Sequence, residues 1–335
     1  MPETDQTKYL YAGARIKTLE NEFLTTSQVD RLITASDWPQ SYEALQATFI
    51  GPYISESDLD PLKPDLEPLN KALEKVITDT KKTLIDIAPD PNLLDMLWLK
   101  YDWHNLKVII LGQKLETNPN DLNLYFNIGK FTPEKLQKAY HNDQLTWLNE
   151  HLAQAARETQ NITDSEKIGA IFNYHYLRQL QEFGRETGSP FIKRLTTLMI
   201  DLFNLKTGLR QLTLRPADSE RVFVEGGSFT LSDLNNVENT LKAFERLGPL
   251  VDWPSATTDY QNTGSYTEIK KAAEEHLMKF LKQESMNIFS PATLFSYFNG
   301  RKNNVQMINI IMTGKQVNSN ENDIRSTLRE LYQAL

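Results

Sequence analysis

Two short polar clusters share the pattern Asp-x-x-Asn-Leu-Lys and stand 99 residues apart, in "YDWHNLKVII" and "IDLFNLKTGL". An acid, an amide and an amine in one place could act as a general acid, a hydrogen-bond donor and a base. The six candidate residues are Asp102, Asn105, Lys107, Asp201, Asn204 and Lys206.

The spacing of these clusters favours a structural role over a catalytic one. Within a helix, the Asp and the Asn are three residues apart and share a face, whereas the Lys two positions later points elsewhere. We therefore expect the Asp and the Asn to bind backbone groups, while Leu106 and Leu205 fill hydrophobic cores.

The other polar patterns do not complete a catalytic or ligand-binding set. The chain has no cysteine, which excludes thiolate metal sites and thiol nucleophiles. "ESDLDPLKPDLE" lacks the glycine and the glutamate of a calcium loop, and "MTGKQ" lacks residues that a phosphate loop requires. No two histidines have the spacing of a helical metal pair, and we expect each at a surface or an interface. The histidines are His104, His141, His151, His175 and His276. The sequence thus predicts no catalytic residue, metal, cofactor or small-molecule substrate.

The residue pattern predicts an all-α fold. Glycine is sparse at 14 residues, and segments such as "SYTEIKKAAEEHLMKFLKQ" carry apolar residues at helical spacing. The polar, proline-bearing stretches 51–66 and 252–264 are predicted to be the longest loops. Residues 221–231 have local strand character, but one short segment cannot form a sheet, so we expect a loop with at most a fragment of strand.

The duplication extends beyond the polar clusters. Pro91 and Pro190 each lie 11 residues before the Asp of their cluster, and Pro291 introduces a third, degenerate copy. In this third copy Asn304 takes the Asp position and "MIN" (307–309) replaces "NLK". Three threonines are predicted to be helix N-caps, and each is followed by an apolar residue four positions later. These threonines are Thr25, Thr132 and Thr230.

The repeats predict three related helical-bundle domains of about 100 residues each, a usual size for a domain. We place them at 1–100, 101–200 and 201–335, the last with a C-terminal closing segment. Three related bundles can close into a pseudo-threefold, funnel-like ring around an axis. This arrangement is an expectation from the repeats.

The composition narrows the class of partner. A net charge of -8 disfavours nucleic acid and anionic lipid as main partners, and suits a basic protein partner better. No stretch approaches the roughly 18 apolar residues of a membrane helix. The acidic start "MPETDQTKYLYAG" lacks the pattern of a signal peptide and predicts a cytoplasmic protein.

The order and spacing of several segments resemble the C subunit, also called the d subunit, of V/A-type ATPases. These segments are "YLYAGARIKTLENEFLT", "DWPQSYEAL", the two "NLK" helices and "IIMTGK". The resemblance implies a non-catalytic, peripheral subunit at the cytoplasmic face of the membrane. Its partners would be the central-shaft subunits and the membrane rotor ring of ion-binding proteolipids, for transport of H⁺ or Na⁺. The alternative is a free-standing helical adaptor, or an enzyme with an unrecognised site.

Overall fold

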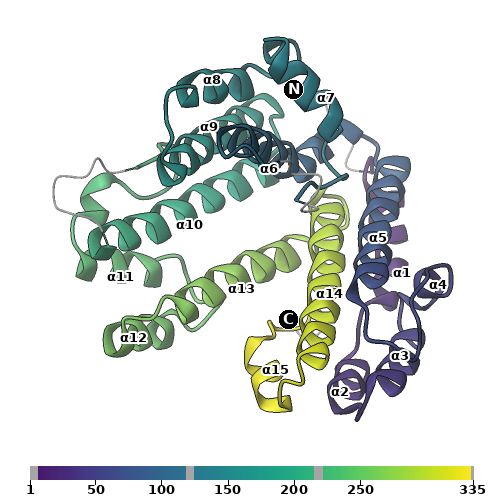
Figure 1. Cartoon of the computed structure of the whole chain (residues 1–335). Helices are drawn as coiled ribbons and strands as arrows, with labels where there is room; N and C mark the ends of the chain where they lie inside the picture. The colour runs from purple at the N-terminus through teal and green to yellow at the C-terminus, as the bar shows by residue number, and fades with distance from the viewer. Residues whose placement is uncertain (1–6, 118–123, 215–221, 333–335) are drawn as a thin grey trace. The chain divides into compact units, whose positions relative to one another are not determined.

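The computed structural model describes residues 7–117, 124–214 and 222–332 (Figure 1). Across these three ranges the regular elements are helices, and none of the described residues forms a strand. The all-α prediction is confirmed. Residues 222–230 form an irregular loop that contains one turn, as expected for that segment, and Leu231 begins a short 3₁₀ helix; residue 221 lies outside the described residues.

The chain divides into two compact units. Unit 1 combines Met1–Pro91 with Met278–Leu335, and unit 2 is Asn92–Leu277. Unit 1 is therefore built from both ends of the chain. The division into three domains at 1–100, 101–200 and 201–335 stays a prediction.

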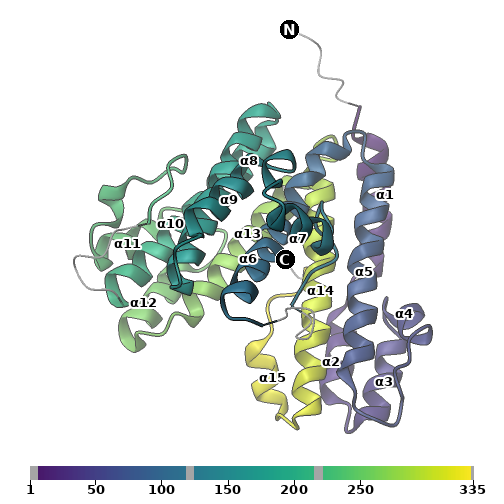
Figure 2. The same ribbon diagram turned by 45° about the horizontal axis from the view of Figure 1, so that its top comes forward.

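Unit 1 packs its helices around the long helix α14 (Ala292–Gln316), which lies beside α5 (Leu66–Ile87) in both ribbon views (Figures 1 and 2). Its core joins apolar residues of α14 and α5 to those of the short N-terminal helices. Lys315, near the end of α14, donates hydrogen bonds to the backbone carbonyls of Ile33 and Ala35. These hydrogen bonds cap the C-terminal end of helix α2. The other α-helices of unit 1 are α1 (Leu10–Leu19), α2 (Thr26–Thr34), α3 (Trp38–Gln46), α4 (Gly51–Ser55), α15 (Glu321–Thr327) and the last part of α13 (Thr267–Glu284).

Unit 2 contains the two helices that carry the repeated polar clusters, α6 (Asp95–Lys114) and α10 (Pro190–Leu214). Both contact α9 (Ser165–Glu186), which also packs against α8 (Glu150–Thr159). Leu106 and Leu205 are fully buried, as predicted. The other helices of unit 2 are α7 (Pro133–His141), α11 (Val237–Glu245), α12 (Trp253–Thr263) and the first part of α13 (Thr267–Glu284).

Two of the predicted loops are partly helical, so those predictions are wrong in part. Gly51–Ser55 forms α4 within the stretch 51–66, and Trp253–Thr263 forms α12 within 252–264. In α12 the side chain of Asp252 accepts a hydrogen bond from the backbone N–H of Ser255 at 3.0 Å. Each of the two helices has a proline in its first turn. The backbone N–H groups of a first turn have no partner within the helix, so a proline there does not break it.

The expectation that every histidine lies at a surface or an interface is wrong for two of them. His175 is 3% exposed and His276 is 2% exposed. Nδ1 of His276 accepts a hydrogen bond from the indole N–H of Trp253 at 3.2 Å, and burial lowers the pKa of His276 to about 4. His276 is therefore a neutral residue of the interior of unit 2.

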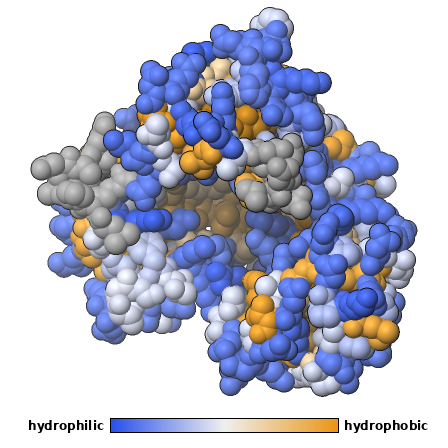
Figure 3. Space-filling model, viewed as in Figure 1, coloured by the Kyte–Doolittle hydropathy of each residue, from blue (hydrophilic) through white to orange (hydrophobic). Residues whose placement is uncertain are grey.

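The surface drawn in Figure 3 is mainly hydrophilic, with several groups of hydrophobic residues among the hydrophilic ones. None of the helices within the described ranges is both long enough and apolar enough to cross a membrane.

Candidate functional site

In the first copy of the repeat, Asp102 and Asn105 hold the backbone of a loop against α6. The backbone N–H groups of Lys130 and Phe131 donate to the two carboxylate oxygens of Asp102 at 3.1 and 3.0 Å. Asn105 binds Phe126 twice: it accepts from its N–H at 2.9 Å and donates to its carbonyl at 2.8 Å. Both side chains are almost completely buried. The two residues therefore work as one clamp on residues 126–131, which we call loop A.

The second copy repeats this clamp on α10. The N–H of Ser228 donates to Oδ1 of Asp201 at 2.6 Å, and the N–H of Phe229 donates to the same atom at 3.4 Å. Asn204 accepts from the N–H of Val224 at 3.0 Å and donates to its carbonyl at 2.8 Å. Residues 224–229, which we call loop B, thus correspond to loop A.

Burial and hydrogen bonding act in opposite directions on Asp201. Desolvation is the larger effect and raises the pKa of the carboxyl, while the hydrogen bonds from Ser228 and Phe229 lower it. The carboxylate nevertheless lies against backbone donors of loop B. The structural role of this acid stays a prediction.

Each clamp depends on a glycine that sequence reasoning missed. A Cβ atom on Gly129 would lie 2.3 Å from Oδ1 of Asp102, and one on Gly227 would lie 2.2 Å from Oδ1 of Asp201. Both distances are too short for any side chain. The missed signal is the shared pattern Gly-x-Phe-Thr, at 129–132 and 227–230.

The third copy keeps part of the clamp but closes it on the N-terminal part of the chain. Oδ1 of Asn304 on α14 accepts from the backbone N–H of Leu24 at 2.9 Å. Leu24 immediately precedes Thr25, just as Phe131 precedes Thr132 in the first copy. This contact agrees with the predicted placement of Asn304 at the Asp position. Met307, at the predicted Asn position, is buried in the core of unit 1.

The threonine caps behave as predicted. Thr25 forms a reciprocal capping box with Gln28 at the start of α2, and Thr132 accepts from the backbone N–H of Lys135 at 3.3 Å at the start of α7. Thr230 forms a capping box with Asp233 at the start of a 3₁₀ helix, Leu231–Leu234. In each copy a clamped backbone thus leads directly into a capped helix.

The helices of the first and third copies also end alike. The carbonyl of Gly112 accepts from the N–H of Thr117 at 2.9 Å, and that of Gly314 accepts from Ser319 at 2.8 Å. The residue before each donor has a positive φ, 52° at Glu116 and 55° at Asn318. These matching ends extend the similarity of the two helices beyond their polar residues.

The two lysines do not join the clamps. Lys107 is half-buried on another face of α6 from the side chains that hold loop A. Lys206 lines a pocket on unit 2, where burial lowers the pKa of its amine although the charge of Glu274 acts in the opposite direction. The structure therefore brings Asp102 to Asn105 and Asp201 to Asn204, and assembles no cluster of three.

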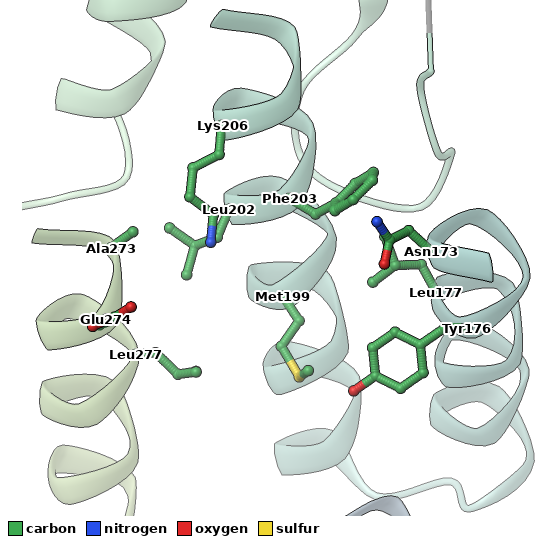
Figure 4. Close-up of a pocket in the computed structure, with 10 residues that line it drawn as sticks. All are labelled: Asn173, Tyr176, Leu177, Met199, Leu202, Phe203, Lys206, Ala273, Glu274 and Leu277. Atoms are coloured by element: carbon green, nitrogen blue, oxygen red, sulfur yellow. The ribbon is translucent and has the colours of Figure 1, made fainter. Parts of the chain in front are cut away.

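The pocket lies on one face of α10, between α9 and α13 (Figure 4). Its volume is about 200 Å³. Lys206 of α10 and Glu274 of α13 extend toward the space between their helices, while Tyr176 of α9 lies beside Met199 (Figure 4). The remaining lining is mostly apolar and includes Leu177, Leu202, Phe203, Ala273 and Leu277.

These features define the class of protein: an all-helical scaffold whose repeated polar residues hold its own backbone. Residues 12–327 match the model of the ATP synthase (C/AC39) subunit family, and the chain belongs to this family. It is 22% identical over 337 residues to the C subunit of the V-type sodium ATPase of Enterococcus hirae, across 95% of this chain and 97% of that protein. The resemblance to the C subunit of V-type ATPases is confirmed. Such a protein is a component of the complex and not its catalytic subunit.

Proposed function

We propose that this chain is the non-catalytic coupling subunit of a rotary V-type ATPase. It joins the central shaft of the soluble, ATP-hydrolysing sector to the membrane rotor ring, and it transmits rotation for transport of H⁺ or Na⁺. It lies at the cytoplasmic face of the membrane. Its three repeats form related helical bundles around the axis of rotation.

The family match over residues 12–327 carries this proposal. The clamps support the non-catalytic part, because Asp102 and Asp201, the two acids of the repeated clusters, both lie against backbone donors of their loops. An acid in this position holds the fold and does not face a substrate. Mechanical coupling is therefore the role of this chain, and ATP hydrolysis that of other subunits.

A coupling subunit must stay bound during many turns of the motor. An interface of roughly 1,600 Å² can reach nanomolar affinity, about -12 kcal/mol, if it is well packed. With an association rate of roughly 10⁶ M⁻¹s⁻¹, such a contact lasts on the order of a thousand seconds. The net charge of -8 favours basic residues on the shaft, so raised salt should slow assembly.

Removal of the subunit tests the proposal. In cells that lack this chain, the soluble sector should still hydrolyse ATP, but membranes should show no ATP-driven ion transport and should bind that sector poorly. Re-expression of the natural chain should restore both properties. Ion transport at normal coupling in its absence would refute the proposal, and so would purification of the natural chain from membranes without any ATPase subunit.

A further inference from the structure

The last described residues of unit 1 are bound to residues near the N-terminus of the chain. Residues 328–332 follow α15 and form no helix, and we call them the C-terminal strap. Tyr332 of this strap is 2% exposed. Its hydroxyl donates to Oε1 of Glu20 at 3.0 Å and lies 2.6 Å from Oγ of Ser296. Its ring packs edge-on against Phe23, with the ring centres 4.9 Å apart. The strap is thus bound to the residues that directly follow α1.

Helices α13 and α14 also hold the strap. Nζ of Lys282, on α13, donates to the backbone carbonyl of Tyr332 at 2.7 Å. Gly300, on α14, leaves room for the aromatic rings, because a Cβ atom there would lie 2.9 Å from ring atoms of both Phe23 and Tyr332. One ring from each end of the chain therefore packs against the backbone of α14 at the same residue.

Helix α1 has little packing of its own. It has ten residues, fewer than the roughly 12–15 at which an isolated helix becomes marginally stable in water. Its buried residues are Ala12, Gly13 and Ile16, and only Ile16 has a large side chain. Elements with few buried apolar contacts open locally at a smaller cost than the whole fold. The stability of α1 should therefore depend on the contacts of the strap with the residues that follow it.

The strap closes a long loop of chain. Tyr332 and Glu20 are 312 residues apart in the sequence, whereas Asp102 and Phe131 of the first clamp are 29 apart. In an unfolded chain the probability of contact falls with about the 3/2 power of the separation, which disfavours the strap by roughly 35-fold. Unit 2 is one continuous segment, so its folding shortens the flexible chain between the strap and Glu20. These separations favour closure of the strap after unit 2 has folded.

We propose that the C-terminal strap closes last in folding and that it alone keeps α1 in place, so that α1 opens whenever the strap is released. During synthesis at about 5–20 residues per second, residue 332 follows Leu277, the end of unit 2, by roughly 3–11 s. A chain that stops before the strap therefore carries an open α1, which proteases can cleave. The inference does not rest on the proposed function, because it concerns the folding of this chain alone.

Hydrogen exchange of the whole chain, followed by mass spectrometry, tests the role of the strap. Tyr332→Ala removes the ring and the hydroxyl, so it should speed exchange in α1 by at least about tenfold. Tyr332→Phe keeps the ring and should speed this exchange by about threefold. Lys282→Met, which removes the hydrogen bond to the strap carbonyl, should have a similar effect. The melting temperature first establishes that each variant is folded.

Ile324→Ala is the matched control. Ile324 is 3% exposed, lies on α15 and packs in the core of unit 1, close to the strap in the sequence. Its contacts are lost when unit 1 unfolds but not when the strap alone is released. Ile324→Ala should therefore speed exchange in α5 by about tenfold or more and leave exchange in α1 within about twofold of the natural chain.

The outcomes decide between a local and a global opening. If Ile324→Ala speeds exchange in α1 as much as in α5, α1 opens only when unit 1 unfolds, and the inference is refuted. It is equally refuted if α1 exchanges at the natural rate in the Tyr332 and Lys282 variants. Should Tyr332→Ala fail to fold, Tyr332→Phe and Lys282→Met give the same decision.

A second measurement addresses the order of folding. The natural chain is refolded from urea and labelled by brief pulses of hydrogen exchange at successive times. Helices α6 and α10 of unit 2 should gain protection before α1 does, and Tyr332→Ala should leave their rates within about twofold of the natural chain. Protection of α1 together with α6, or before it, would overturn the proposed order.

Discussion

The two asparagine clamps make the same pair of hydrogen bonds, but they differ in their access to water. Asn204 binds both backbone groups of Val224, which is 0% exposed, whereas Asn105 binds those of Phe126, which is 43% exposed. A buried backbone group that loses its partner costs about 1–3 kcal/mol. Asn204→Ala leaves two such groups, so it should lower the free energy of unfolding by about 3–5 kcal/mol. Asn105→Ala should cost about 1–2 kcal/mol, because water can reach Phe126.

Urea unfolding followed by tryptophan fluorescence measures this difference. Of the five tryptophans only Trp38 lies outside unit 2, so the signal reports mainly on the unit that contains both clamps. Asn173→Ala, a change of an exposed asparagine in the same unit, should alter the free energy by less than about 0.5 kcal/mol. If Asn105→Ala costs as much as Asn204→Ala, or more, burial of the bound loop does not set the strength of the clamp.

Two further predictions concern unit 2. Gly227→Ala should lower the free energy of unfolding by about 1–3 kcal/mol, because its Cβ would collide with the side chain of Asp201. Gly169 lies within α9 and has room for a Cβ, so Gly169→Ala should raise the free energy of unfolding by about 0.5–1 kcal/mol. Equal effects of the two substitutions in urea unfolding would contradict this prediction. Burial lowers the pKa of His276 from 6.5 to about 4. Between these two pH values the unfolded chain binds a proton at this residue and the folded chain does not. The free energy of unfolding should therefore fall by up to about 3 kcal/mol as the pH drops from about 6.5 to about 4. His276→Gln should remove that part of the pH dependence, and an unchanged slope of unfolding free energy against pH would argue against it.

The features that sequence alone predicted are those set by local spacing. The all-α class, the threonine caps and the shared face of Asp102 and Asn105 depend on residues that are a few positions apart in the sequence. At such separations the geometry of the helix determines which side chains are neighbours. The same local reasoning misjudged residues 253–263, because a polar stretch with a proline looks like a loop although its first turn tolerates that proline.

The features that sequence alone could not supply are contacts between distant segments. Nothing near Asn204 in the sequence indicates Val224 as its partner, and nothing near Lys206 indicates that Glu274 lies at the same pocket. Such contacts depend on how helices pack, which spacing within one helix does not determine. The glycines are an intermediate case, since their pattern was visible while their contact with the carboxylates was not.

The third copy shows which part of the clamp the fold retains when its surroundings change. Asn304 keeps the acceptor that an Asp would provide, but its Nδ2 is buried and has no hydrogen-bond partner within the described part of the chain. A buried donor without a partner costs stability, whereas the hydrogen bond from Leu24 to Oδ1 contributes to it. That bond joins α14 to the N-terminal segment across 280 residues of sequence. The clamp that closes a local loop in unit 2 therefore joins the two ends of the chain in unit 1.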